Sequence, residues 1–145
     1  RSQDDYQVID SAAAVPEEYF RDTSLVVQRF LPEVENGLYH VRSYCFLGDR
    51  ATCMRLSSRQ PVIHWRNALG IEAVEPHPDI IAERVRLGMD FCKLDYVLHD
   101  GRAVLIDVNK TPGATRGESN ALLLAMRREQ ARGIFGYLGM PVPED

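Results

Sequence analysis

The chain has 145 residues, 45% of them hydrophobic, and a formal net charge of −4 from 17 basic and 21 acidic side chains. This composition is that of one globular domain with a sizeable core. The acidic balance argues against a nucleic-acid partner, although it leaves room for a local basic pocket. No apolar run approaches the roughly 20 residues that cross a bilayer, so we expect no membrane partner.

Three cysteines, Cys45, Cys53 and Cys92, lack the C-x-x-C spacing of metal or redox sites. They predict reduced, mostly buried thiols and a cytoplasmic location. The four histidines show no zinc-ligand spacing, so no zinc site is expected. Because the first residue is Arg1 rather than Met, we expect the chain to be a piece of a longer protein.

The N-terminal segment, residues 1–24, predicts only short elements: a strand over 6–9 and brief helical turns after Ser11 and Pro16. The run Leu25–Leu31 is rich in strand-forming residues and ends at Pro32. It predicts a strand followed by an acidic loop.

Two longer strand runs, 38–47 and 51–56, flank Gly48-Asp49, a pair suited to a two-residue hairpin turn. That register sets Arg42 opposite Arg55 on one face. Two facing cations attract an anion, for which phosphate is the natural candidate. Two solvated surface arginines are the alternative.

A loop over residues 57–70 precedes a helix over about 80–88, capped by Asp79 and ended by Gly88. The last helix is expected over 118–138, after a turn at 111–113 and a polar loop over 114–120. Gly133 and Gly136 are its weak points. The resulting element order, four strands, a helix, two strands and a helix, predicts an α+β domain.

The most informative stretch is the hairpin that Asp100-Gly101 predicts after residue 91. Alternation predicts one core face made of Leu94, Tyr96, Leu98, Val104, Ile106 and Val108. These residues can share one face only if the turn has an odd number of residues, such as residues 100–102. That register makes Asp95 the direct partner of Asp107. Lys93 and Asn109 then lie on the same polar face.

Facing carboxylates need compensation, because two charges ~4 Å apart at an effective dielectric of about 20 repel by roughly 4 kcal/mol. A divalent cation removes this repulsion, and Mg²⁺ favours one or two carboxylates together with waters and phosphates. A solvated polar face, in which Lys93 pairs with the acids, is the alternative.

The pattern Lys93-x-Asp95, followed by Ile106-Asp107-Val108-Asn109-x-Thr111-Pro112-Gly113, resembles the metal-binding hairpin of the ATP-grasp ligases. The resemblance implies Asp95, Asp107 and Asn109 as ligands of Mg²⁺, with Mn²⁺ as an alternative ion. It implies a catalytic role for Lys93 beside the transferring phosphoryl group. The family more often has Glu at the second acid and Arg in place of Lys93.

Upstream segments extend this resemblance to about residues 26–113. The family's hinge strand, whose backbone contacts adenine, resembles residues 28–31, which are Gln28, Arg29, Phe30 and Leu31. The ribose-binding acid would be Glu35, with Glu33 as the alternative.

Four further side chains receive roles from the resemblance. Arg42 and Arg55 would bind the ATP phosphates. Arg66 and Asn67 resemble a family element that reaches the phosphates or the acceptor, which gives Arg66 a catalytic role and Asn67 a nucleotide contact. His40 stands where the glutamate-adding members often have Asp.

The resemblance implies an antiparallel sheet with helices packed on one face, namely the ATP-grasp C-terminal subdomain over 25–145, preceded by a remnant of the neighbouring subdomain over 1–24. It implies an ATP- and Mg²⁺-dependent ligase that activates a small-molecule or peptide carboxylate as an acyl phosphate, which an amine or similar nucleophile attacks. The isolated chain would be incomplete without the N-terminal half of the same protein, and a homodimer is an open alternative. A non-catalytic nucleotide- or metal-binding regulatory module and a plain interaction domain are the rival hypotheses.

Overall fold

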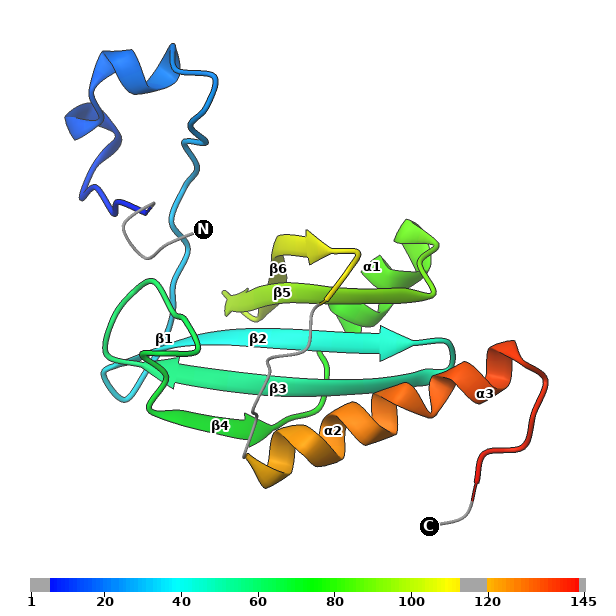
Figure 1. Cartoon of the computed structure of the whole chain (residues 1–145). Helices are drawn as coiled ribbons and strands as arrows, with labels where there is room; N and C mark the ends of the chain where they lie inside the picture. The colour runs from blue at the N-terminus through cyan, green and yellow to red at the C-terminus, as the bar shows by residue number, and fades with distance from the viewer. Residues whose placement is uncertain (1–5, 113–119, 144–145) are drawn as a thin grey trace.

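One antiparallel sheet organises the molecule (Figure 1), and the computed structural model describes residues 6–112 and 120–143. The strand order is β4-β3-β2-β5-β6, and β1 pairs with β2 beyond the end of β5. The strands are β1 (Glu33–Glu35), β2 (Leu38–Leu47), β3 (Arg50–Ser58), β4 (Gly70–Ala73), β5 (Phe91–His99) and β6 (Arg102–Asn109). The predicted α+β class is confirmed.

The apolar core lies between one face of the sheet and α1 (Pro78–Leu87). Its buried members alternate along the strands: Tyr44, Phe46, Cys53, Cys92, Leu94 and Tyr96, which Ile80 of α1 covers. Gly88 ends α1 in a left-handed conformation, as expected. The predicted cap is wrong, because His77 caps the helix through Nδ1, while Asp79 accepts hydrogen bonds from Arg102 and Ala103 of β6.

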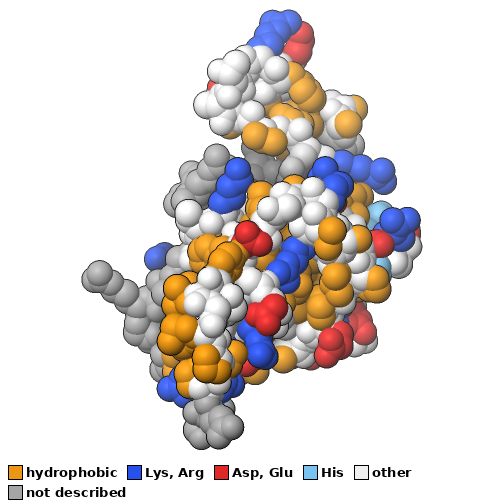
Figure 2. Space-filling model, turned by 90° about the vertical axis from the view of Figure 1, so that its right-hand side faces the viewer, with side chains coloured by type: hydrophobic (Ala, Val, Ile, Leu, Met, Phe, Trp, Pro, Cys, Tyr) orange, Lys and Arg blue, Asp and Glu red, His pale blue; other side chains and the backbone are white. Residues whose placement is uncertain are grey.

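The opposite face of the sheet carries α2 (Ala121–Ala131), which contacts β2 and β3. Arg50, whose side chain alternates with that of core-facing Ala51, donates to Glu129 of α2 at 3.1 Å. The expectation that the helices share one face is therefore wrong. Figure 2, a side view, shows hydrophobic, basic and acidic side chains interspersed over the surface that faces the viewer.

The expected helix over 118–138 is divided in two at Arg132, where α2 ends and α3 (Gly133–Tyr137) begins. Asn120 caps α2 by accepting a hydrogen bond from the Leu123 amide. Residues 114–119 of the loop predicted over 114–120, residues 118 and 119 of the expected helix and Gly113 of the predicted turn lie outside the described residues.

Residues 6–32 form an N-terminal arm that stands away from the sheet in Figure 1. The two brief helical turns are confirmed as η2 (Ala12–Ala14) and η3 (Glu17–Phe20). The strands predicted over 6–9 and 25–31 are wrong: both segments are irregular, and residues 21–30 are all exposed. Strand-forming residues need a neighbouring strand for their hydrogen bonds, and no described strand lies beside 25–31.

None of the helices in the described ranges has the length and the apolar character that crossing a bilayer requires.

Candidate functional site

The β5–β6 hairpin turns through only two residues, Asp100 and Gly101, which have φ angles of 50° and 73°. His99 pairs with Arg102, so the three-residue turn expected from the sequence is wrong. An irregularity in the ladder between positions 95 and 96 supplies the missing residue: Tyr96 pairs with Leu105, whereas Asp95 pairs with Asp107. Ile106 is the extra, bulged residue. The predicted Asp95–Asp107 pair is confirmed.

The bulge also changes which side chains of β6 reach the core. Ala103, Leu105 and Val108 pack against it, whereas Ile106 is 46% exposed. The core positions predicted for Val104 and Ile106 are therefore wrong, because one inserted residue inverts the alternation on its turn-proximal side.

Asp95 is held by two donors on the face opposite the core. Ser43, its partner on β2, donates from Oγ to Oδ1 at 2.5 Å, and Lys93 Nζ lies 2.5 Å from Oδ2. Asp107 is exposed and forms no hydrogen bond or ion pair within the described part of the chain. One acid of the facing pair is thus oriented and neutralised, while the other is open to solvent.

Asn109 lies opposite Lys93, two pairs along the ladder from the two acids and on their face. Its Oδ1 accepts a hydrogen bond from the Thr111 amide at 2.9 Å, just after β6 ends. Two carboxylates and an amide oxygen form the hard oxygen donor set that Mg²⁺ takes, and each oxygen has a lone pair beyond those already engaged. No group of three or more His, Cys, Asp or Glu side chains suited to a metal occurs in residues 6–112 and 120–143. The candidate set contains only two such residues.

Cys45 of β2 lies opposite Lys93 on the same face and forms part of the floor of this site. Burial raises the pKa of its thiol to about 12, with Lys93 and Arg127 of α2 acting in the opposite direction. A thiol with such a pKa stays protonated near neutral pH, so Cys45 is not a nucleophile. Sequence reasoning missed Ser43, Cys45 and Arg127 as neighbours of the site, because nothing local to these residues indicates the β2–β5 pairing or the position of α2.

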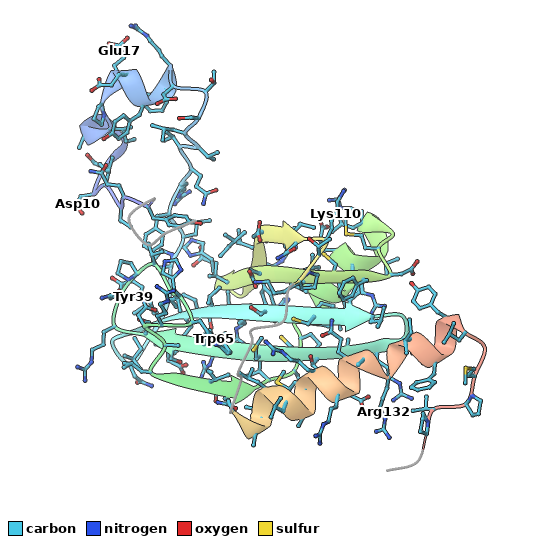
Figure 3. The ribbon with its side chains drawn as sticks, in the orientation of Figure 1. Asp10, Glu17, Tyr39, Trp65, Lys110 and Arg132 are labelled. Carbon is cyan, nitrogen blue, oxygen red and sulfur yellow. The ribbon has the colours of Figure 1, made fainter. Side chains whose placement is uncertain are left out.

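The predicted hinge residues lie in the arm, where Gln28, Arg29 and Phe30 are exposed and Leu31 is half-buried. The Phe30 ring packs against Tyr39, with ring centroids 6.5 Å apart. Figure 3 places Tyr39 at the end of the sheet that the arm approaches.

Tyr39 shares a sheet face with the acid pair. It lies four residues before Ser43 on β2, so alternation puts both on one face, roughly 14 Å apart at about 3.4 Å per residue. An aromatic contact and the facing pair Asp95 and Asp107 therefore occupy one face at a separation comparable to the length of a nucleoside triphosphate.

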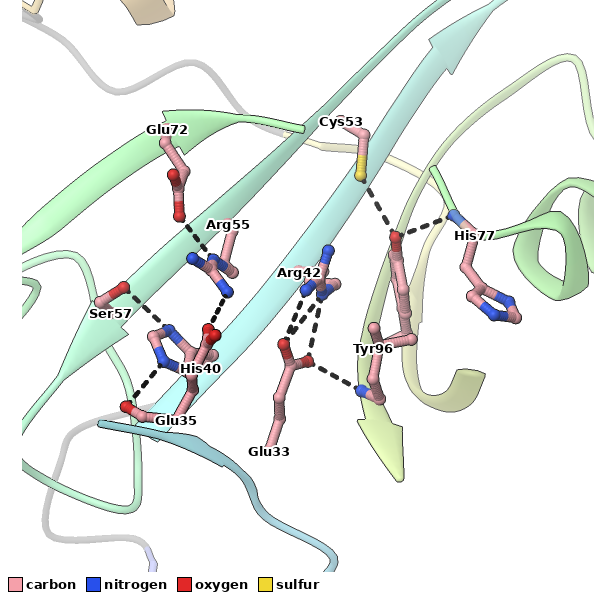
Figure 4. Close-up of polar contacts among 11 residues, drawn as sticks. Glu33, Glu35, His40, Arg42, Cys53, Arg55, Ser57, Glu72, His77 and Tyr96 are labelled. Atoms are coloured by element: carbon pink, nitrogen blue, oxygen red, sulfur yellow. Dashed lines mark hydrogen bonds and ion pairs between the residues drawn. The ribbon is translucent and has the colours of Figure 1, made fainter. Parts of the chain in front are cut away.

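Strand alternation places Arg42 and Arg55 on the face opposite Ser43 and Asp95. Figure 4 shows the contacts of these two arginines and of Glu35. Arg42 and Arg55 are cross-strand partners, as predicted. However, Arg42 pairs with Glu33 at 2.8 Å, and Arg55 pairs with Glu35 at 2.7 Å and with Glu72 at 2.5 Å. The anions that face these two cations are glutamates of the same chain.

These ion pairs occupy the side chains of Arg42, Arg55 and Glu35, whose predicted nucleotide contacts remain predictions. Glu35 is engaged by Arg55, whose hydrogen bond and charge hold the pKa of the carboxyl below its usual range. The alternative acid, Glu33, is also committed, since its Oε2 accepts a hydrogen bond from the Leu98 amide at 2.8 Å. A nucleotide bound over Asp95 and Asp107 cannot reach this opposite face.

The Arg66-Asn67 element lies in the loop between β3 and β4. The Asn67 amide is used within that loop: Oδ1 accepts from the His64 amide, and Nδ2 donates to Gln60 and to the Val62 carbonyl. The Asn67 side chain thus stabilises the loop, and Arg66 is exposed; the roles predicted for both remain predictions.

No protein-family model, curated protein or solved structure matches this chain.

Proposed function

We propose that this chain is the Mg·ATP-binding part of a carboxylate-activating ligase of the ATP-grasp type. The observation that supports it most is the register of the β5–β6 hairpin, which sets Asp95 opposite Asp107 and Lys93 opposite Asn109 on one face. Directly opposed acids destabilise a sheet unless a cation compensates them. Lys93 compensates Asp95 alone, whereas a divalent cation could bridge both acids.

In this proposal, Asp95, Asp107 and Asn109 hold the metal, which when bound neutralises the ATP phosphates. Ser43 keeps the Asp95 carboxylate in place through its 2.5 Å hydrogen bond. Lys93 supplies a mobile positive charge for the transferring phosphoryl group. The protein then contributes positioning and electrostatic stabilisation, which is most of what phosphoryl transfer to a carboxylate requires.

The Phe30–Tyr39 pair is the proposed platform for the base, since every nucleobase can stack on an aromatic ring.

Arg42, Arg55, Glu35 and Asn67 are not part of the proposed site, because their side chains are committed to other contacts. We propose the substrates only by chemical class, as a carboxylate and an amine. The N-terminal half that would complete the enzyme is likewise proposed without further detail. A cytoplasmic location also fits it, since all three cysteines are free thiols.

The test is the stabilisation of the full chain by Mg²⁺ and a non-hydrolysable ATP analogue, measured by thermal unfolding and calorimetric titration. We expect D95N and D107N to abolish the Mg²⁺-dependent stabilisation, which amounts to about 2.7 kcal/mol at a ligand concentration 100 times Kd. D100N is the matched control, because it removes one acid from the turn of the same hairpin.

Equal affinity of D95N, D107N and D100N for the Mg²⁺ complex would contradict the proposal. Turnover is a separate question: trapping of an acyl phosphate by hydroxylamine distinguishes a ligase from a module that only binds nucleotide.

A further inference from the structure

The contact between Lys93 and Asp95 places a cation on one of the two facing acids. Lys93 Nζ lies 2.5 Å from Asp95 Oδ2, and the two side chains are 29% and 18% exposed. Both residues belong to β5 and are two apart, so the lysine reaches the acid along its own strand and on the same face. The ammonium thus neutralises Asp95 at Oδ2, one of the two oxygens through which this carboxylate could bind a metal ion.

We propose that Lys93 is an internal counter-cation, which competes with a divalent cation for Asp95 and is released toward a polyphosphate when that cation binds. This inference rests on the proposed function and adds a coupling between the two ligands. Its consequence is that the metal and the nucleotide bind more favourably together than their separate affinities predict.

The charges at the site support this coupling. Asp95, Asp107 and Lys93 together carry one net negative charge, which disfavours an approaching phosphate anion. A bound divalent cation changes that sum to one net positive charge and takes over the neutralisation of Asp95. The site therefore becomes attractive to a polyphosphate only after the metal has replaced Lys93.

The side-chain chemistry makes Lys93 suited to such an exchange. A lysine ammonium is a compact charge on a flexible stem, and a partly exposed ion pair contributes little stability. Ser43 binds the other carboxylate oxygen, Oδ1. It can therefore hold Asp95 in position whichever cation neutralises the group.

The experiment is a calorimetric titration of the full chain with Mn²⁺ alone, for K93M and K93R. K110M and K110R are the matched controls, because Lys110 is exposed and directly follows β6 (Figure 3). We expect K93M to bind Mn²⁺ about fivefold or more tightly than K110M, since no side-chain cation competes. K93R should bind it more weakly than K110R, since a guanidinium can hold the carboxylate with two hydrogen bonds.

A second titration, with a non-hydrolysable ATP analogue at saturating Mn²⁺, tests the release. K93M should bind the analogue about tenfold more weakly than K110M, although it binds Mn²⁺ alone more tightly. A purely structural role for Lys93 would not produce these opposite changes.

The outcomes separate this inference from the proposed function. If the chain binds Mn²⁺ but K93M binds it no more tightly than K110M, the counter-cation role is wrong and the metal site remains. If no variant, K93M included, binds Mn²⁺, both the inference and the proposed metal site are wrong.

Discussion

Asp107 faces Asp95 because Ile106, the residue before it, is bulged out of the β5–β6 ladder. With a two-residue turn and no bulge, Asp107 would oppose Leu94 and point into the core. Burying an unpaired carboxylate costs several kcal/mol, whereas partly exposing an isoleucine costs on the order of 1 kcal/mol. The bulged hairpin therefore has the lower free energy, and the bulge places the two acids opposite each other.

Deleting Ile106 should preserve the acid pair, because the remaining residues then form a regular hairpin with Asp95 opposite Asp107. We expect the free energy of unfolding to change by less than about 2 kcal/mol. Cross-strand nuclear Overhauser contacts between Leu94 and Val108 would report the register. Deletion of Leu105 is the control, since it removes a core residue and should unfold the chain. Contacts between residues 94 and 107 in the Ile106 deletion would contradict the account.

Glu33 is expected to be a major determinant of stability. Its carboxylate accepts from the Arg42 guanidinium and from the Leu98 amide, and the Glu33 and Arg42 side chains are only 10% and 13% exposed. E33A leaves a buried cation and a backbone donor unpaired, so urea denaturation should show a loss of about 3–5 kcal/mol. E17A removes the exposed pair with Arg21 and should cost less than about 0.5 kcal/mol. Similar losses of unfolding free energy in E33A and E17A would show that the buried ion pair contributes no more to stability than the exposed one.

Two glycines of α3 should respond in opposite directions to alanine. A Cβ at Gly133 would lie 1.8 Å from the Leu47 carbonyl oxygen, whereas at Gly136 its nearest neighbour is 3.6 Å away. G133A should therefore destabilise the protein by about 2–4 kcal/mol through overpacking. G136A should stabilise it by about 0.5–1 kcal/mol through helix propensity. Chemical denaturation of both variants checks this, and a neutral G133A would mean that α3 does not pack on the β2–β3 turn.

The Cys45 thiol should be unreactive at ordinary pH. Because burial raises its pKa to about 12, its thiolate fraction at pH 8 is about a thousandfold below that of a free cysteine with a pKa of about 8.5. Alkylation of the native protein, followed by mass spectrometry of the Cys45 peptide, should be slow. The rate should rise about tenfold per pH unit up to roughly pH 11, whereas that of a free thiol levels off above about pH 9. Rapid native labelling at pH 8, at the rate found in urea, would contradict the assigned burial.

Local chemistry explains how much of this molecule could be predicted. The Gly48-Asp49 turn, the position but not the length of the turn at Asp100-Gly101, the end of α1 at Gly88 and the Arg42–Arg55 pairing follow from residues close together in the sequence. Turn geometry and strand alternation depend mainly on such neighbours, so they are readable without the fold.

The errors arise where distant segments compete for the same groups. The glutamates that face Arg42 and Arg55 come from β1 and β4. Residues 25–31 have a strand-forming composition, but no strand of the described ranges lies beside them. His77, rather than Asp79, caps α1, while Asp79 is engaged by β6. The energy of each such contact depends on a partner that the local sequence does not specify.

The sequence by itself determined the antiparallel α+β class and the facing of Asp95 and Asp107, because the period of a strand and the polarity of its residues act locally. Only the tertiary structure decided how that facing is reached, through a bulge rather than a longer turn, and which donors hold Asp95. It also determined which glutamates form ion pairs with Arg42 and Arg55 on the opposite face. Pairing across the sheet depends on the strand order, and that order results from packing of the whole chain rather than from any one segment.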